Sequence, residues 1–402
     1  MRKSSRIPSP MIRPALVAVT VALLAQPAAA RVVRIVIDTV SPLDNGAYEA
    51  LSGRAFGELD PTHPLNAIIQ DIQLGKDPDG KVRYVASFSL VKPVDLRAAS
   101  GLMWHDVPNR GGRITLAASS RAEGDIGLSS GWQGDNAGNT TVPPYARELG
   151  PQSVVVNREW TAVPIAKHQD GSPVTGLVFG RIVNRSGPAS QLIRVQANPL
   201  PYKPATLDTT QATLVVRAHE TMEGVVTGET QIASSDWAWA KCMDWASRTP
   251  LLPTDAPEIC LKNGFDPNRL YQVVFTARDP YVLGVGFAAF RDMASFFRNQ
   301  VADDVGTPNP VAGAVKWVIS RGVSQSGNFL RGFLHLGFNQ DESGQPVYDG
   351  MWPIIAGRRI ALNFRWAQPD GVLELYQAGS EGPQWWHKFP DHVRGLPPGG
   401  IM

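Results

Sequence analysis

The chain has 402 residues, of which 43% are hydrophobic and 18% are charged, a balance typical of a globular protein with a large core. The formal net charge is only +2 and no run of Lys and Arg builds a basic face, so the sequence does not point to a partner that is a nucleic acid. The length suits one large domain with an insertion, or two domains.

Residues 1–30 have the pattern of a secretory signal peptide. The basic start "MRKSSR" precedes an apolar stretch over residues 15–25 and the small residues Ala28, Ala29 and Ala30. We predict cleavage after Ala30 and a secreted or periplasmic protein. An uncleaved anchor is the alternative, but the apolar stretch is shorter than the roughly 20 residues that span a bilayer. No later segment has a transmembrane pattern, so we expect no stable membrane insertion.

Short runs rich in β-branched residues predict strands across residues 31–136. Three of them are "RVVRIVIDTV", "VRYVASFSLVKPV" and "GLMWHDVP", and "GLSSGWQGDN" ends a fourth. Residues 137–268 contain many prolines and strand-like runs such as "GLVFGRIV" and "ATLVVRAHE", with no long helical pattern. We interpret them as a β-rich insertion or cap, with a short helix in "SSDWAWAKCMDW".

The cysteines of the chain, Cys242 and Cys260, both lie in this β-rich stretch. Export would favour a disulfide between them, closing a loop of about 17 residues and contributing roughly 3 kcal/mol. Two free buried thiols are the alternative. A zinc site is not indicated, because two cysteines without a matching pair of histidines do not complete one.

From residue 269 onward the pattern changes to alternating strands and helices. Residues 271–276, "AVKWVIS" and "MWPIIAG" predict strands. Two apolar stripes with helical spacing predict the helices between them. The stripes consist of Phe287, Phe290, Met293 or Ala294, and Phe297 in the first helix, and of Phe329, Phe333 and Leu336 in the second.

The sequence Gly322-Val323-Ser324-Gln325-Ser326, followed by Gly327, stands between a predicted strand and a predicted helix. Small neighbours allow a very tight turn there, which would expose the Ser324 hydroxyl beside the unpaired N–H groups of the helix start. Such a serine is a candidate nucleophile, and the N–H of Gln325 is a candidate donor to an oxyanion. Placing the nucleophile at Ser326 would put the larger Asn328 in a small-residue position, so we prefer Ser324. An ordinary Gly/Ser-rich turn is the alternative.

Several stretches together resemble the α/β-hydrolase superfamily, and more narrowly a group of secreted bacterial α/β-hydrolase domain proteins. They are "MWHDVPNRGGR", "SGWQGDN", "RDPYVLGVGFAAFRDMASFFR", "GVSQSGNFLRGFLHLGFNQDESGQPVYDGMWPIIAG" and "LNFRWAQPDG". The resemblance implies a mainly parallel sheet with helices on both faces. Residues 31–136 and 269–402 would form this hydrolase domain around the β-rich insertion at 137–268.

The resemblance also implies roles for residues outside the tight turn at residues 322–327, which is called the elbow below. The loop 109–112 would bring a second oxyanion donor, from the N–H of Arg110 or Gly111, although an ordinary Gly-rich loop is the alternative. We expect Trp132 and Asp135 to shape the pocket rim rather than to act in catalysis. Arg291 and Asp292 on one apolar helix, and Arg331 on the other, are expected to form buried or half-buried ion pairs that hold the helices together.

The catalytic base is harder to place. In this fold the order along the chain is Ser, acid, His, so the base should follow Ser324. His335 lies too far along the elbow helix, which leaves His387 and His392 as possible bases. Group members continue past a corresponding end, so the resemblance implies that this chain is truncated at its C-terminus and lacks the usual histidine. The acid stays open among four residues: Asp370, Glu374, Glu381 and Asp391.

These features favour a secreted serine hydrolase of the carboxylic ester type, which forms an acyl-enzyme on Ser324. Its partner would be a small-molecule ester, and the chemistry needs no metal or organic cofactor. A catalytically incomplete protein that acts as a binding module or is a non-functional fragment is the alternative, and acyl transfer instead of hydrolysis stays open. The sequence indicates no oligomeric state.

Trp-rich stretches either cap the pocket or pack in the core; they contain Trp237, Trp239, Trp245, Trp385 and Trp386.

Overall fold

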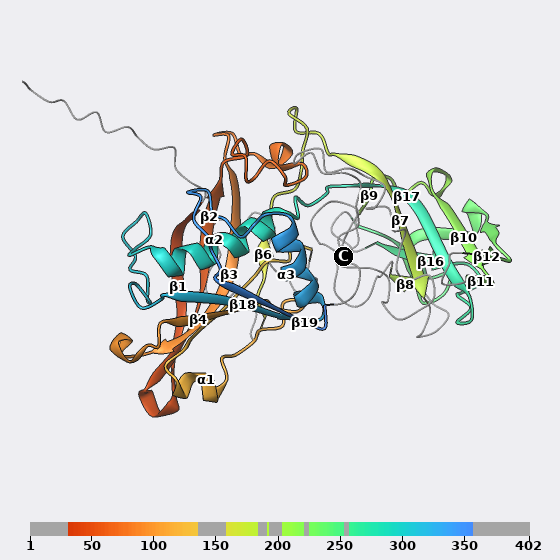
Figure 1. The fold of residues 1–402 in the computed structure, drawn as a ribbon. Helices are drawn as coiled ribbons and strands as arrows, with labels where there is room; N and C mark the ends of the chain where they lie inside the picture. Colours follow the sequence, from red (N-terminus) through yellow and green to blue (C-terminus); the bar gives the residue numbers. More distant parts are fainter. Residues whose placement is uncertain are drawn as a thin grey trace, which may run out of the picture.

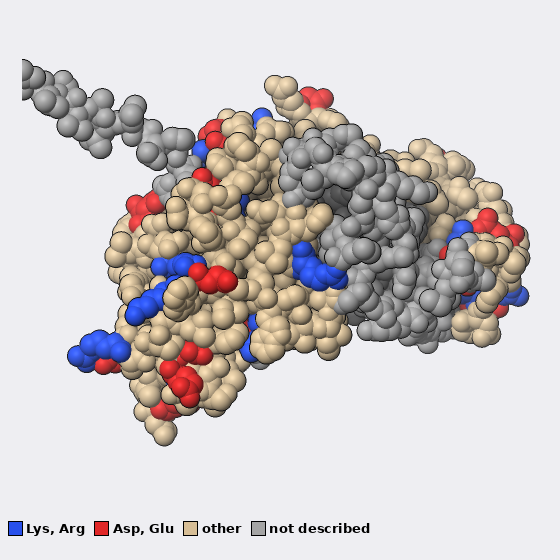
Figure 2. Space-filling view, in the orientation of Figure 1, with Lys and Arg blue, Asp and Glu red and all other residues tan. Residues whose placement is uncertain are grey.

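The computed structural model describes residues 31–135, 158–183, 191–192, 203–220, 225–252 and 257–356. These residues form two parts, which Figure 1 shows beside each other. One part is a large sheet that carries the helices, and the other is built from smaller sheets. The mixture of charges on the visible face agrees with the balanced composition, because Figure 2 shows Lys and Arg scattered among Asp and Glu rather than gathered in one basic patch.

The large sheet has eight strands, and its direction of pairing changes halfway across. Its strands, in spatial order, are β1 (Arg31–Leu43), β2 (Tyr48–Leu59), β3 (Val82–Pro93), β5 (Ile126–Ser130), β4 (Leu102–Asp106), β18 (Trp317–Val323) and β19 (Gly350–Ile354), with β6 (Thr161–Ala162) paired to β3. The pairs from β1 to β5 are antiparallel, whereas β5, β4, β18 and β19 pair in parallel. The sheet is therefore mixed, and the prediction of a mainly parallel sheet is wrong for its first half.

The helices lie mostly on one face of this sheet. The long helices of the described residues, α2 (Val285–Asn299) and α3 (Gln325–His335), pack on each other through Phe287 and Phe329, whose ring centroids are 4.5 Å apart. The remaining α-helix is the short α1 (Ala118–Ala122). Helices on both faces were expected, but the described residues contain fewer helices and more strands than that prediction. Within the described ranges, each helix is too short or too polar to cross a membrane.

The first predicted apolar stripe is confirmed, and so are Phe329 and Phe333 of the second, whereas Leu336 lies one residue beyond the end of α3 and is half-buried against the same core. The first stripe is buried in α2, and in α3 Phe329 and Phe333 are buried against it. The charges of α2 also form the expected ion pair, since Arg291 Nε lies 2.7 Å from Asp292 Oδ1 and both side chains are fully buried. Tyr84 from β3 donates its hydroxyl to Asp292 at 3.2 Å. Breaking such a pair would leave an uncompensated charge in the core, so it ties α2 to the sheet.

His105 is a fully buried histidine in the middle of β4. Its ring stacks on Phe290 of α2, with centroids 3.8 Å apart, and its two nitrogens lie 2.8 Å from Tyr348 Oη and Ser130 Oγ. Tyr348 donates its own proton to the carbonyl of Phe290, so His105 Nδ1 carries the ring proton and Nε2 accepts from Ser130. Burial lowers the pKa of His105 well below its usual 6.5.

We therefore expect acid to destabilise the protein through His105. Its pKa is lower in the folded state, so below about pH 6.5 the unfolded chain binds a proton that the folded chain excludes, and stability falls with pH at up to about 1.4 kcal/mol per unit. Urea unfolding at pH 7 and pH 5.5 should show a smaller loss for His105→Gln than for the wild type. The exposed His168 provides the matched control, His168→Gln. An equal loss in the wild type and His105→Gln would contradict this expectation.

The second part consists of antiparallel strands. One five-stranded sheet has the order β13 (Thr230–Ile232), β10 (Thr213–Arg217), β17 (Leu270–Arg278) and β7 (Thr175–Val183), with β9 (Lys203–Pro204) on β17. A four-stranded sheet has the order β15 (Thr249–Pro250), β14 (Trp237–Lys241), β16 (Glu258–Leu261) and β8 (Gln191–Leu192), and β11 (His219–Glu220) pairs with β12 (Val226–Thr227). β17 thus pairs within the second part, although the sequence assigned residues 271–276 to the hydrolase part.

The disulfide between Cys242 and Cys260 is confirmed, with Cα atoms 5.8 Å apart. It joins the end of β14 to β16. The helix expected in this segment is wrong, because β14 alternates its side chains and buries Trp237 and Trp239 in the core of the second part. These two tryptophans are core residues, with ring centroids 5.4 Å apart.

Candidate active site

The chain turns sharply at Ser324, between the end of β18 at Val323 and the start of α3 at Gln325. Ser324 has φ 61° and ψ −116°, a backbone conformation that a residue with a Cβ rarely adopts. Its N–H donates to the carbonyl of Ile354 in β19 at 2.9 Å, and its own carbonyl accepts from the N–H of Asn328 at 2.9 Å. Strain of this kind costs about 1–3 kcal/mol and persists where the surrounding structure fixes it, typically at functional sites.

Two glycines make the turn possible. A Cβ on Gly322 would lie 2.4 Å from the carbonyl oxygen of Ser326, and a Cβ on Gly327 would lie 2.7 Å from that of Ile354. Both neighbours are backbone atoms, which cannot rotate away. Ser326 itself is fully buried in the first turn of α3, and its Oγ has no hydrogen-bond partner among the described residues. Ser324, by contrast, is half-buried at the end of the sheet.

The loop 109–112 is a tight turn held against the elbow. Arg110 and Gly111 have φ values of 50° and 80°, and the N–H of Gly112 donates to the carbonyl of Asn109 at 2.9 Å, as in a type I′ turn. Asn109 Nδ2 donates to the carbonyl of Val323 at 3.0 Å, directly before the serine. The loop that the resemblance assigned to the oxyanion site therefore does contact the elbow.

A chain of buried amides connects this loop to α3. The N–H of Arg110 donates to Gln325 Oε1 at 3.0 Å, and Gln325 Nε2 donates to Gln133 Oε1 at 3.0 Å. Gln133 Nε2 in turn donates to Asp135 Oδ1 at 3.1 Å. The Arg110 amide is thus occupied, which corrects the expectation that it faces an oxyanion. No partner of the Gly111 N–H occurs within the described residues, so Gly111 is the better candidate donor.

Other contacts hold the loop from its far side. The carbonyl of Gly111 accepts from the N–H of Glu159 at 2.7 Å, and the buried Glu159 carboxylate pairs with Arg113 Nε at 2.6 Å. Burial raises the pKa of Glu159, although Arg113 opposes that effect. Trp132 Nε1 donates to the carbonyl of Pro108 at 2.8 Å. Trp132 is therefore a buried support of the loop.

Asp135 connects the site to the second part of the molecule. It is fully buried, and burial, followed by the charge of Asp135, raises the pKa of Tyr281 to about 12. Tyr281 forms a β-bridge with Ile165 and packs against the cores of both parts. The amide chain from Gln325 to Asp135 thus ends where the two parts meet.

The remaining predicted residues separate into two groups. His335 is the last residue of α3, on the order of 16 Å along the helix from Ser324, so its position agrees with a structural role. The candidate bases and acids lie outside the described residues; they are His387, His392, Asp370, Glu374, Glu381 and Asp391. Among the described residues, no three or more His, Cys, Asp or Glu side chains are grouped so as to hold a metal ion.

The sequence did not reveal the roles of Gln133, Glu159 and Arg113. Gln133 lies inside the stretch "SGWQGD", in which the sequence pattern points only to Trp132 and Asp135. No sequence pattern indicates that a glutamine will form hydrogen bonds between two loops. The partners of Glu159 come from strands and loops far apart in the chain, so only the folded structure brings them together.

Comparison with known proteins identifies the family. The model of the alpha/beta hydrolase domain family matches residues 173–382, just over half of the chain, and this range includes β18, the elbow and α3. No curated protein and no solved structure gave a significant match. A match over this share of the chain, with the strand, serine turn and helix inside it, identifies the fold family. The chain belongs to the alpha/beta hydrolase domain family.

Proposed function

We propose that this protein is a serine hydrolase that acts on carboxylic esters, with Ser324 as its nucleophile. The observation that carries the proposal is the strained backbone of Ser324 at the junction of β18 and α3. This geometry projects a hydroxyl from the end of the sheet beside the N–H groups of a helix start. Membership of the hydrolase family supports the same reading.

In the proposed reaction, Ser324 Oγ attacks the ester carbonyl carbon and its proton passes to a general base. The carbonyl oxygen becomes an anion, which accepts hydrogen bonds from the N–H groups of Gln325 and Gly111. The carbon–oxygen bond to the alcohol then breaks, the alcohol takes the proton, and an acyl-enzyme is left. Water then takes the place of the alcohol: it gives a proton to the base as it attacks the acyl carbon, the bond to Ser324 Oγ breaks, Oγ takes the proton back, and the carboxylic acid leaves.

The candidates for the general base lie outside the described residues, so the identity of the base is part of the proposal. His387 and His392 are the candidates that follow Ser324 in the order typical of this fold. His387→Ala and His392→Ala, made separately, should distinguish them, because only the true base is needed for turnover. If both variants keep wild-type turnover, neither residue is the base.

The basic start, apolar stretch and small residues at 28–30 support export of the protein. We expect the mature chain to begin at Arg31. N-terminal sequencing of the protein recovered from the periplasm or the medium would measure this directly. A chain that is exported with residues 1–30 still attached would contradict it.

Hydrolysis of p-nitrophenyl esters of increasing acyl length tests the proposed function. The expected result is turnover preceded by a burst of p-nitrophenol with a stoichiometry near one per chain, because the acyl-enzyme accumulates. A burst without turnover, or no reaction at all, would favour the alternative of a catalytically incomplete protein that binds ligands. Faster product formation with an added alcohol acceptor would favour acyl transfer.

The amide chain gives a separate prediction for catalysis. Gln325→Leu keeps the backbone donor but removes the side-chain contact with the Arg110 N–H, so the loop 109–112 should lose its fixed position. We expect kcat to fall about 10- to 100-fold with a small change in KM, since misplaced donors affect the transition state most. Gln340→Leu, at an exposed glutamine, is the matched control. An unchanged kcat in Gln325→Leu would show that its side chain does not position the loop.

A further inference from the structure

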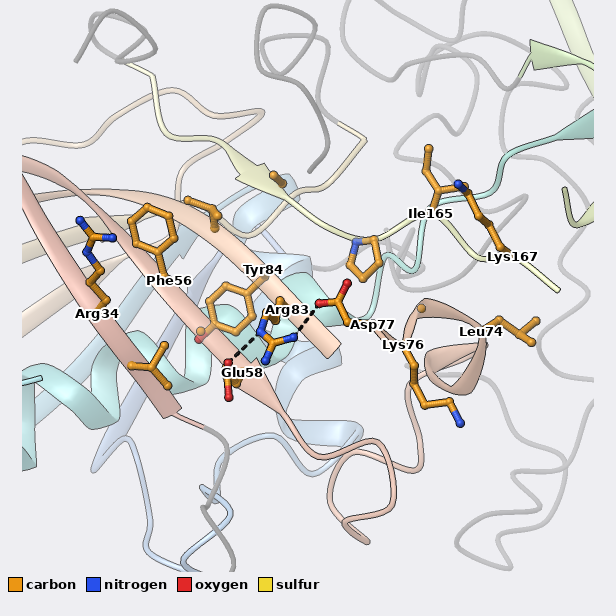
Figure 3. Close-up of a pocket in the computed structure, with 16 residues that line it drawn as sticks. Arg34, Phe56, Glu58, Leu74, Lys76, Asp77, Arg83, Tyr84, Ile165 and Lys167 are labelled. Carbon is orange, nitrogen blue, oxygen red and sulfur yellow. Dashed lines mark hydrogen bonds and ion pairs between the residues drawn. The ribbon is translucent and has the colours of Figure 1, made fainter. Parts of the chain in front are cut away.

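The outer face of strands β1–β3 carries a pocket of about 410 Å³ that the proposed reaction does not use. A cross-strand row forms its floor, because Arg34 pairs with Phe56, Phe56 with Val85, and Val85 with Ala162. The opposite face of the same strands is covered, since Tyr84 reaches Asp292 of α2 there. Figure 3 shows the pocket, which the segments at Leu74–Lys76 and Ile165–Lys167 close on one side.

This pocket is distinct from the elbow. Two strands, β5 and β4, separate β3 from β18 in the sheet, so the floor lies on the order of 14 Å or more from the serine. Its volume lies within the range of about 300–1,000 Å³ that is typical of small-molecule sites.

The charges around the pocket leave an excess of cations. Arg83 is already neutralised, because it pairs with Glu58 at 2.7 Å, with Asp77 at 2.9 Å and with Asp79. Lys76 and Lys167 are exposed, and Figure 3 places both at the end of the pocket away from Arg34, on opposite sides and with side chains that point apart. Within the described residues, neither ammonium group has a carboxylate partner. The Arg34 guanidinium lies 5.5 Å from the centroid of the Phe56 ring.

We propose that this pocket binds a small amphipathic carboxylate, such as an alkyl carboxylate. Its chain would lie on the apolar row of Phe56, Val85 and Ala162, and its carboxylate would lie at the end of the pocket away from Arg34, between Lys76 on one side and Lys167 on the other. The apolar walls provide burial, and the unpaired ammonium groups select the anion over an uncharged chain of the same length. The inference does not depend on the proposed reaction at Ser324.

Calorimetric titration of the full chain with decanoate, 1-decanol and acetate tests this proposal. We expect decanoate to bind at least five-fold more tightly than 1-decanol, and acetate to give no measurable binding. The double variant Lys76→Gln/Lys167→Gln should lose the preference for decanoate, whereas Lys316→Gln, at an exposed lysine elsewhere, should keep it. Ile165→Trp should fill the pocket and weaken both longer ligands about ten-fold or more.

The controls separate this site from the elbow. Decanoate binding should be unchanged in Ser324→Ala, and far-UV circular dichroism should show that each variant is folded. If Ile165→Trp does not fold, the lysine variant alone decides. Equal affinities for decanoate and 1-decanol, an unchanged preference in the double lysine variant, or loss of binding in Ser324→Ala would each overturn the proposal.

Discussion

Replacing Ser324 with alanine is expected to lower kcat/KM for ester hydrolysis by at least about a thousand-fold. The nucleophile forms the covalent intermediate, and water attacking directly would keep only the help of the oxyanion donors and substrate binding. The substitution removes one half-buried hydroxyl, so the variant should unfold at nearly the same urea concentration as the wild type. Steady-state rates with p-nitrophenyl butyrate, together with urea unfolding, measure both effects.

Ser326→Ala is the matched control, because it removes the same group two residues further on. Its hydroxyl is fully buried and without a described hydrogen-bond partner, so its loss should leave both the rate and the stability close to wild type. If Ser326→Ala abolished hydrolysis while Ser324→Ala kept it, the assignment of the nucleophile would be wrong.

Replacing Gly322 with alanine is expected to lower the free energy of unfolding by about 3 kcal/mol and to abolish activity. The added Cβ would lie 2.4 Å from the carbonyl oxygen of Ser326 and 3.0 Å from the N of Gly327. Both atoms belong to the first turn of α3, so the helix must shift away from β18 and the elbow must open. Urea unfolding monitored by tryptophan fluorescence measures the loss of stability.

Gly350→Ala tests whether the effect comes from the elbow rather than from any glycine in the sheet. Gly350, in β19, pairs with Ile319 of β18, and a Cβ on Gly350 would meet its nearest neighbour only at 3.7 Å. We therefore expect its stability to change by less than about 1 kcal/mol. Similar losses in Gly322→Ala and Gly350→Ala would show that close packing at the turn is not the cause.

The elbow and its two helices could be predicted because their signals are local. The apolar spacing in α2 and α3 follows the helical period, and the small residues around Ser324 have few uses other than a tight turn. The mixed sheet could not be predicted in the same way. β2 has a weak strand pattern because Gly53 and Gly57 interrupt it. The structure explains why these positions are glycines. A Cβ at these positions would meet the rings of Phe88 and Tyr84.

The sequence also did not predict which strands pair with each other. β17 alternates buried and half-buried residues, as a strand with one covered face does, but this pattern does not say which sheet it joins. Its pairing with β7 and β10 places it in the second part. In β14, the short sequence "WAWAK" fits a strand with a period of two, and the tryptophans at its odd positions form part of a core that the sequence does not indicate.

For the site, the sequence led to the residues but not to their contacts. Ser324, Gln325 and the loop 109–112 are adjacent in the structure, as the resemblance implied. The direction of a side-chain amide is set by its neighbours after folding. For that reason the sequence did not reveal that the Arg110 N–H donates to Gln325 Oε1, although we had predicted this N–H as an oxyanion donor. Because the Arg110 N–H is occupied, the N–H of Gly111 becomes the candidate for the second oxyanion donor.

Reaction of the wild-type protein with a fluorophosphonate, followed by tandem mass spectrometry of its peptides, tests the central claim most directly. The phosphonate forms a bond only with an activated hydroxyl, so the site of modification identifies the nucleophile. We predict one phosphonate per chain, attached to Ser324. Hydrolysis of esters by a protein whose phosphonate is attached to another residue would contradict the assignment.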